Sequence, residues 1–204
     1  MSKEQMLKQI KIDCNKNNIK LHILKRSDYR DSISQVVEIK SYQGWFCSKH
    51  KELVAWQTPQ MYQVLAHEYS HMLQFVENYP PAVKLIKGIN ASSMLDLCRM
   101  ELELPSAVIN QALTQVLQLE WDCERRTLAL FDEYNLAVNK RRYLATAMSI
   151  LYAYVFETRT GKKINIPSCP PFLLPIADGL LEKLPKKFKI DEKIYSKFAN
   201  YLKQ

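Results

Sequence analysis

Glycine is scarce in this sequence, with only four in 204 residues. No G-x-G-x-x-G or Walker sequence occurs, which excludes the common glycine-rich loops that hold nucleotide phosphates. No apolar run reaches the roughly eighteen residues that a membrane-spanning helix needs. Residues 1–5 also lack the apolar core of a signal peptide. We therefore expect a cytoplasmic protein that does not contact a membrane.

The cysteines offer little for cross-linking. There are five, an odd number, and no two form a C-x-x-C pair: Cys14, Cys47, Cys98, Cys123 and Cys169. Neither a disulfide framework nor a zinc knuckle built from cysteines is indicated. We expect reduced thiols, as is usual in a cytosol.

Acidic residues are outnumbered, and the formal net charge is +8. Much of the excess lies in residues 140–142 and 183–203, and in the second range aromatic residues alternate with lysines. A basic, aromatic stretch can bind nucleic acid. Helical spacing of three or four residues instead predicts an inward apolar face that includes two of the aromatics. Its residues are Ile190, Ile194, Phe198 and Tyr201. Nucleic-acid binding therefore stays open but is not favoured.

The most informative stretch is the H-E-x-x-H pattern at residues 67–71. On a helix, residues four apart share a face, so the rings of His67 and His71 can reach one metal ion. Glu68 then reaches a water bound to that ion, which is the arrangement of a zinc hydrolase. The alternative is a partly exposed helix with two surface histidines.

Sequence signals place this motif in the middle of a helix. Thr58 and Pro59 predict an N-cap and a first helical position, and prolines at 80 and 81 predict the end. Two neighbouring stripes recur at helical spacing: Tyr62, Leu65, Tyr69, Met72, Leu73 and Val76 in one, and Val64, His67, Glu68, His71 and Phe75 in the other. We expect a nearly buried helix, whose histidines and glutamate must be paired or ligated.

The order of the elements indicates an α+β protein. A short helix over about 4–12 precedes strand candidates at 19–23 and 34–39, and residues 44–47 and 53–56 form a hairpin candidate. From residue 58 onward the pattern is helical. We expect one domain over 1–204, with a sheet-rich part (1–57), a helical core that carries the metal site (58–160) and a C-terminal extension (161–204).

A catalytic zinc site needs a third protein ligand besides the two histidines. The long helical pattern over 106–134 places Glu120 near the centre of its inward stripe, so we rank Glu120 first. Glu124 lies one turn further on and ranks second; it could instead hold an imidazole N–H in place. Glu120 could also be the buried partner of Arg142.

These residues resemble the gluzincin type of zinc metallopeptidase, in which a glutamate from a later helix completes the H-E-x-x-H site. The matching residues are His67, Glu68 and His71, followed by Glu120 with Glu124 four positions on. Residues 65–74 and 119–126 also look like compact metallopeptidase-like proteins of tailed phages and mobile elements. The resemblance covers a small fraction of the chain and implies a zincin-like fold.

Related zinc peptidase families fit less well. Metzincins need a glycine and a histidine where this chain has Gln74 and Glu77, and aspzincins need a Gly-Thr pair that the chain lacks. SprT-like proteases take a third histidine downstream, but no histidine follows His71. A glutamate ligand therefore remains the expectation from the sequence.

The resemblance implies a zinc-dependent metallopeptidase that acts on proteins or peptides. In that chemistry Glu68 takes a proton from the attacking water and passes it to the leaving amine. The substrate is expected to pair as an extra strand with the exposed edge at residues 44–47. Tyr143, Tyr152 or Tyr154 could stabilise the oxyanion. The alternatives are a zincin-like module with a structural metal that binds nucleic acid or protein, and an inactive scaffold without metal.

Overall fold

The computed structural model describes residues 1–25, 43–99, 104–164 and 169–203. Within them the chain combines a small three-stranded sheet with a helical majority, so the α+β prediction is confirmed. The strand candidate at 34–39 lies outside the described residues. No helix in these ranges is both long and apolar enough to cross a membrane.

The chain divides into two compact units. The first comprises residues 1–79 and 126–138, and the second comprises residues 80–125 and 139–204. Helix α5 (Ser106–Glu133) runs without a break through the point where the division falls. The last two turns of α5 therefore belong to the first unit.

The first unit holds the sheet and the helix that carries the motif. Its elements are α1 (Lys3–Lys16), β1 (Lys20–Leu24), β2 (Gly44–Cys47), β3 (Glu52–Trp56) and α2 (Met61–Val76). The strand order is β1-β3-β2; β1 pairs with β3 in parallel, and β2 pairs with β3 antiparallel. The predicted hairpin is confirmed. Among the described strands, β2 is an edge that pairs only with β3.

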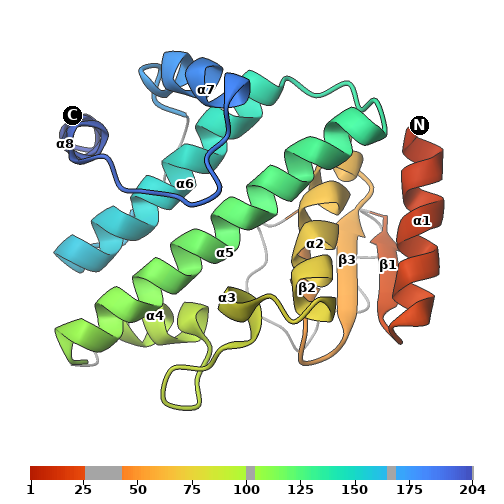
Figure 1. Cartoon of the computed structure of the whole chain (residues 1–204), viewed down its shortest axis with the longest axis horizontal. Coiled ribbons are helices and arrows are strands. Elements are labelled where there is room, and N and C mark those ends of the chain that lie inside the picture. The colour runs from red at the N-terminus through yellow and green to blue at the C-terminus, as the bar shows by residue number, and fades with distance from the viewer. Residues whose placement is uncertain (26–42, 100–103, 165–168, 204) are drawn as a thin grey trace. The chain divides into compact units, whose positions relative to one another are not determined.

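In Figure 1, α1 lies beside β1 and α2 lies beside β3. Side chains of the two helices contact each other at two points. Met6 and Ile10 of α1 are fully buried, as their helical spacing predicted. The Tyr69 hydroxyl donates a hydrogen bond to the carboxylate of Asp13, and the Cys14 thiol contacts the Met72 sulfur at 3.6 Å. These contacts hold α2 from the side that faces α1.

Helix α2 begins later than the sequence predicted. Its N-cap is Gln60, and the hydroxyl of Thr58 donates to the Gln43 side chain at 3.2 Å instead of capping the helix. Because the Met61 N–H bonds to the carbonyl of Thr58, residues 58–60 form a turn before the first helical residue. The prolines at 80 and 81 follow the end of the helix, as predicted.

The second unit is helical. It contains α3 (Pro80–Val83), α4 (Ala91–Arg99), the first five turns of α5, α6 (Lys140–Thr160), α7 (Leu173–Glu182) and α8 (Glu192–Tyr201). In Figure 1, α7 and α8 lie beside α6. Trp121 of α5 is buried against Phe188, and its indole N–H donates to the Pro185 carbonyl at 2.8 Å. An aromatic cluster around Phe188 therefore forms part of the core of this unit.

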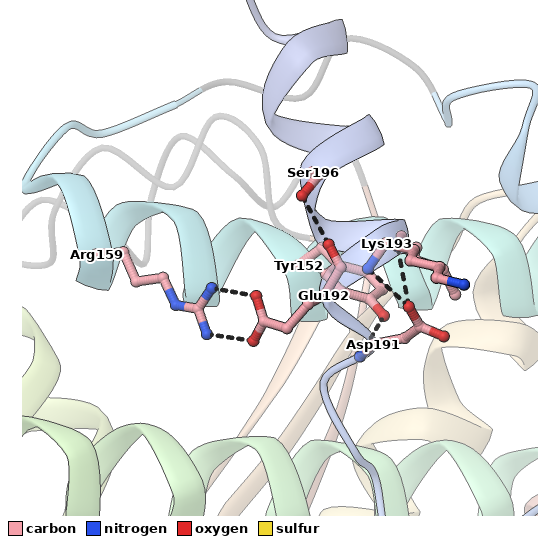
Figure 2. Close-up of polar contacts among 7 residues, drawn as sticks. Tyr152, Arg159, Asp191, Glu192, Lys193 and Ser196 are labelled. Carbon is pink, nitrogen blue, oxygen red and sulfur yellow. Dashed lines mark hydrogen bonds and ion pairs between the residues drawn. The ribbon is translucent and has the colours of Figure 1, made fainter.

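The basic C-terminal segment packs its aromatics inward. Phe188 and Phe198 are buried, and both contact the ring of Tyr152. Figure 2 shows how α8 is fixed: Asp191 caps its N-terminus through Lys193 and Ile194, and Glu192 makes a two-pronged ion pair with Arg159. The inward-face prediction is confirmed for Phe198, whereas Ile194 and Tyr201 are half-buried and Ile190 lies before the helix. Its aromatic rings are occupied by packing and are not presented as a stacking surface for bases.

Strand β2 approaches α2 so closely that only glycine fits at position 44. A Cβ atom on Gly44 would lie 2.5 Å from a methyl carbon of Val64 and 2.7 Å from the carbonyl oxygen of Val54. The same position is 3.4 Å from the Cγ atom of Glu68. The missing side chain therefore allows the edge strand to lie directly against the motif helix.

We expect Gly44→Ala to lower the free energy of unfolding by about 1–3 kcal/mol, the usual cost of forcing a methyl group into a packed site. The added methyl meets a backbone oxygen held in the sheet, which cannot move aside without disturbing β3. Urea denaturation measures the change. Gly179→Ala in α7 is the matched control, because nothing lies within 4 Å of its added methyl. That variant should be neutral or more stable; equal stability of Gly44→Ala and wild type would contradict the close approach.

Candidate metal centre

Helix α2 presents His67, Glu68 and His71 on one face. All three are half-buried, whereas Leu65, Tyr69 and Met72 on the neighbouring stripe are buried. No residue of α2 is exposed, but Tyr62, Leu73 and Val76 of the neighbouring stripe are also only half-buried, so the expectation of a nearly buried helix is confirmed in part. The centres of the two imidazole rings are 4.8 Å apart, and their planes are nearly perpendicular. The three polar side chains of the motif therefore remain partly accessible to solvent.

The two residues between Glu68 and His71 anchor the motif to its surroundings. Burial and the hydrogen bond to Asp13 raise the pKa of Tyr69, so its hydroxyl remains a proton donor. The Ser70 hydroxyl lies 3.2 Å from the hydroxyl of Thr127 and donates to the Ala66 carbonyl at 2.8 Å. Tyr69 thus fixes α2 to α1, and Ser70 fixes it to the last turns of α5.

The structure brings Cys123 to the two histidines. One ligand atom from each of His67, His71 and Cys123 lies within 4.8 Å of the other two. Cys123 is fully buried. These three residues, which we call the His-His-Cys group, could hold a metal ion.

The chemistry of this donor set narrows the kind of metal. Imidazole nitrogen and thiolate sulfur suit zinc and other borderline or soft transition metals. Magnesium and calcium prefer oxygen ligands and fit poorly. The residues present therefore fit a transition-metal site.

The sequence prediction did not include Cys123 among the ligands. Cys123 shares the inward stripe of the long helix with apolar residues such as Leu113 and Phe131, and no motif marked it as a ligand. The available signal was its position on the same face as Glu120 and Glu124, since a buried cysteine beside two such acids offers a soft ligand. The absence of a C-x-x-C pair hid this signal, because that pattern describes sites built mainly from cysteine.

The two glutamates differ in their surroundings. Glu124 is buried, and its carboxylate accepts a hydrogen bond from the Tyr143 hydroxyl. Glu120 is half-buried, and Arg142, its alternative partner, is exposed. Neither acid belongs to the His-His-Cys group. Glu120 as the third ligand, with Glu124 as its alternative, stays a prediction.

Two of the tyrosines considered for the oxyanion have structural partners. The Tyr143 hydroxyl donates to Glu124. The Tyr152 hydroxyl accepts the N–H of Asp191 at 3.3 Å, and its buried ring packs on Phe188 and Phe198. Tyr152 therefore serves the packing around α8. Tyr154 is half-buried.

Strand β2 contacts the face of α2 that carries the motif at two points. Gly44 lies against Val64 and Glu68, and the ring of Phe46 packs on Phe75 with 5.8 Å between centres. Residues 68, 71 and 75 succeed one another along that face, so the strand passes His71 between its two contacts. The predicted edge strand and the predicted metal ligands therefore lie together in the first unit.

No family model, curated protein or solved structure matches this chain.

We expect the purified protein to bind about one zinc ion, and His71→Ala to lose it, because two donors hold zinc far less tightly than three. Elemental analysis after dialysis measures the stoichiometry. His22→Ala is the control, since His22 lies on β1 beside Glu52 and outside the His-His-Cys group. Zinc retained in His71→Ala at the wild-type level would rule out this site.

Proposed function

We propose that the protein is a zinc-dependent metallopeptidase with a zincin-like fold. The observation that carries this proposal is the position of Glu68. Its carboxylate comes from the half-exposed face that also bears both histidines, and its side chain adjoins an edge strand. A purely structural metal site has no need of an acid between two ligands, whereas hydrolysis needs a base there.

Zinc fits the residues present. We propose that His67 and His71 hold it together with Cys123, with Glu120 and then Glu124 as the alternatives predicted from the sequence. When bound, zinc supplies a Lewis acid that acidifies water and polarises a carbonyl group.

Glu68 performs the proton transfers in this proposal. Its carboxylate accepts a proton from the water that attacks the peptide carbonyl carbon, and the water oxygen forms the new bond to that carbon. Glu68 then delivers the proton to the amide nitrogen as the carbon–nitrogen bond breaks, so that a carboxylate and an amine leave. The half-exposed position of Glu68 allows it to meet a water molecule while its stem packs near Gly44.

The exposed edge of β2 is the proposed binding surface for a peptide substrate. Its unpaired side in the described sheet offers backbone N–H and C=O groups, which can pair with an extended chain whatever its side chains are. Because β2 runs past His71, a peptide added to this edge brings its backbone carbonyl groups toward the metal-binding face.

A nucleic-acid-binding module with a structural metal is the alternative raised by the sequence. The basic C-terminal segment does carry many lysines, but Phe188 and Phe198 are buried in the core of the second unit, and Tyr195 and Tyr201 are half-buried. No described feature favours this alternative over hydrolysis.

The third ligand can be identified with Co²⁺ in place of zinc. A thiolate ligand adds an intense charge-transfer band in the near ultraviolet, which carboxylate and imidazole ligands do not. We expect Cys123→Ser to remove this band, and Cys169→Ser, the matched control, to retain it. Glu120→Gln and Glu124→Gln should also retain it. A wild-type protein that binds Co²⁺ without the band, and loses Co²⁺ affinity in Glu120→Gln, would assign the glutamate instead.

We expect Glu68→Gln to lower peptidase activity by several orders of magnitude while zinc still binds. The amide keeps the shape of the side chain but cannot accept the proton of the attacking water. Hydrolysis of unfolded proteins and of a peptide library measures the activity, and elemental analysis checks the zinc. Glu77→Gln, the same change at the exposed C-cap residue of α2, is the control, since Glu77 lies outside the H-E-x-x-H motif. Zinc-loaded wild type that cleaves nothing in this panel would contradict the proposed function.

A further inference from the structure

Gln74 is a polar residue in an unusual place. It lies on α2 three residues after His71 and is fully buried. Its side-chain oxygen Oε1 is 3.0 Å from Nδ1 of His71. Burying a carboxamide is unfavourable unless its polar atoms are hydrogen-bonded, and in the described residues no buried side-chain nitrogen or oxygen lacks a partner.

This hydrogen bond selects one form of the imidazole. Oε1 can only accept, so Nδ1 of His71 must carry the proton and donate it. The lone pair of the neutral ring is then on Nε2. A metal ligand must offer a lone pair, so Nε2 is the atom of His71 that can bind a metal.

We propose that Gln74 is the positioning residue for this metal site: it holds His71 in the Nδ1–H form and directs Nε2 toward the metal. The inference rests on the proposed zinc site. It adds that the partner of the histidine is a neutral amide, where metal-bound histidines often have a carboxylate. A neutral amide attracts the Nδ1 proton less strongly than a carboxylate does. The imidazole therefore donates less electron density to the metal, and the metal remains a stronger Lewis acid.

The first test uses the metal-free protein. Nitrogen-15 NMR of labelled histidines, recorded at a pH where the rings are neutral, reports which ring nitrogen carries the proton. We expect His71 to be in the Nδ1–H form in wild type and to become a mixture of both forms in Gln74→Met, which has similar size but no acceptor oxygen. The signals of His22 and His50 should not change, and they serve as internal references. An unchanged His71 signal in a folded Gln74→Met protein would overturn the proposal.

The second test measures metal affinity by competition with a chelator. We expect Gln74→Met to bind zinc roughly ten- to a hundredfold more weakly, as loss of a histidine-orienting partner usually does. Gln74→Glu should bind at least as tightly as wild type, because its carboxylate accepts the same hydrogen bond more strongly. Gln111→Met, the same change at an exposed position of α5, should match wild type.

These two measurements separate the failure of the inference from the failure of the proposed function. If wild type binds no zinc, the proposed function fails, while the NMR result still decides the role of Gln74. If Gln74→Met does not fold, Gln74→Glu decides the matter: equal or tighter binding supports the proposal, and a loss of affinity overturns it. Zinc affinity that is the same in wild type, Gln74→Met and Gln74→Glu also overturns it.

Discussion

The close approach of β2 to α2 is the constraint on which the candidate site depends. A side chain at position 44 would collide with Val64 and with the backbone of β3, so the strand could not lie against the helix. Because it does, the free edge of the described sheet and the carboxylate of Glu68 are neighbours. The absence of a side chain at position 44 thus places the proposed base beside the proposed peptide-binding edge.

Helix α2 divides its tasks between adjacent stripes. Tyr69, Ser70 and Met72 fasten the helix to α1 and to the end of α5 through buried contacts. The histidines and Glu68 are left half-exposed on the other stripe. Rigid support on one side and access on the other is what a metal site needs, since ligands must be held in place while water and substrate come and go. Gln74 is also buried and lies one turn after His71, whose ring it contacts, so it connects the support to the ligand.

Periodicity was sufficient to predict most elements, because the buried faces of α1, α2 and α5 follow the helical repeat and the hairpin follows the alternating one. The start of α2 was misplaced because Thr58 and Pro59 have the composition of a helix start but form a turn that is tied to Gln43. The metal ligands on one helix could be predicted from their spacing. The partner from α5 could not, because three residues on one face, Glu120, Cys123 and Glu124, are close to equivalent in the pattern.

The contact between Ser70 and Thr127 joins positions 57 residues apart in the sequence. The His-His-Cys group lies one helical turn away from it and spans a similar length of chain. An ion held by that group would act as a cross-link that closes a long loop, and such links mainly reduce the freedom of the unfolded chain. Metal binding and folding are then thermodynamically linked. In a cell, the metal supply would therefore affect both the activity of the protein and the amount that escapes degradation.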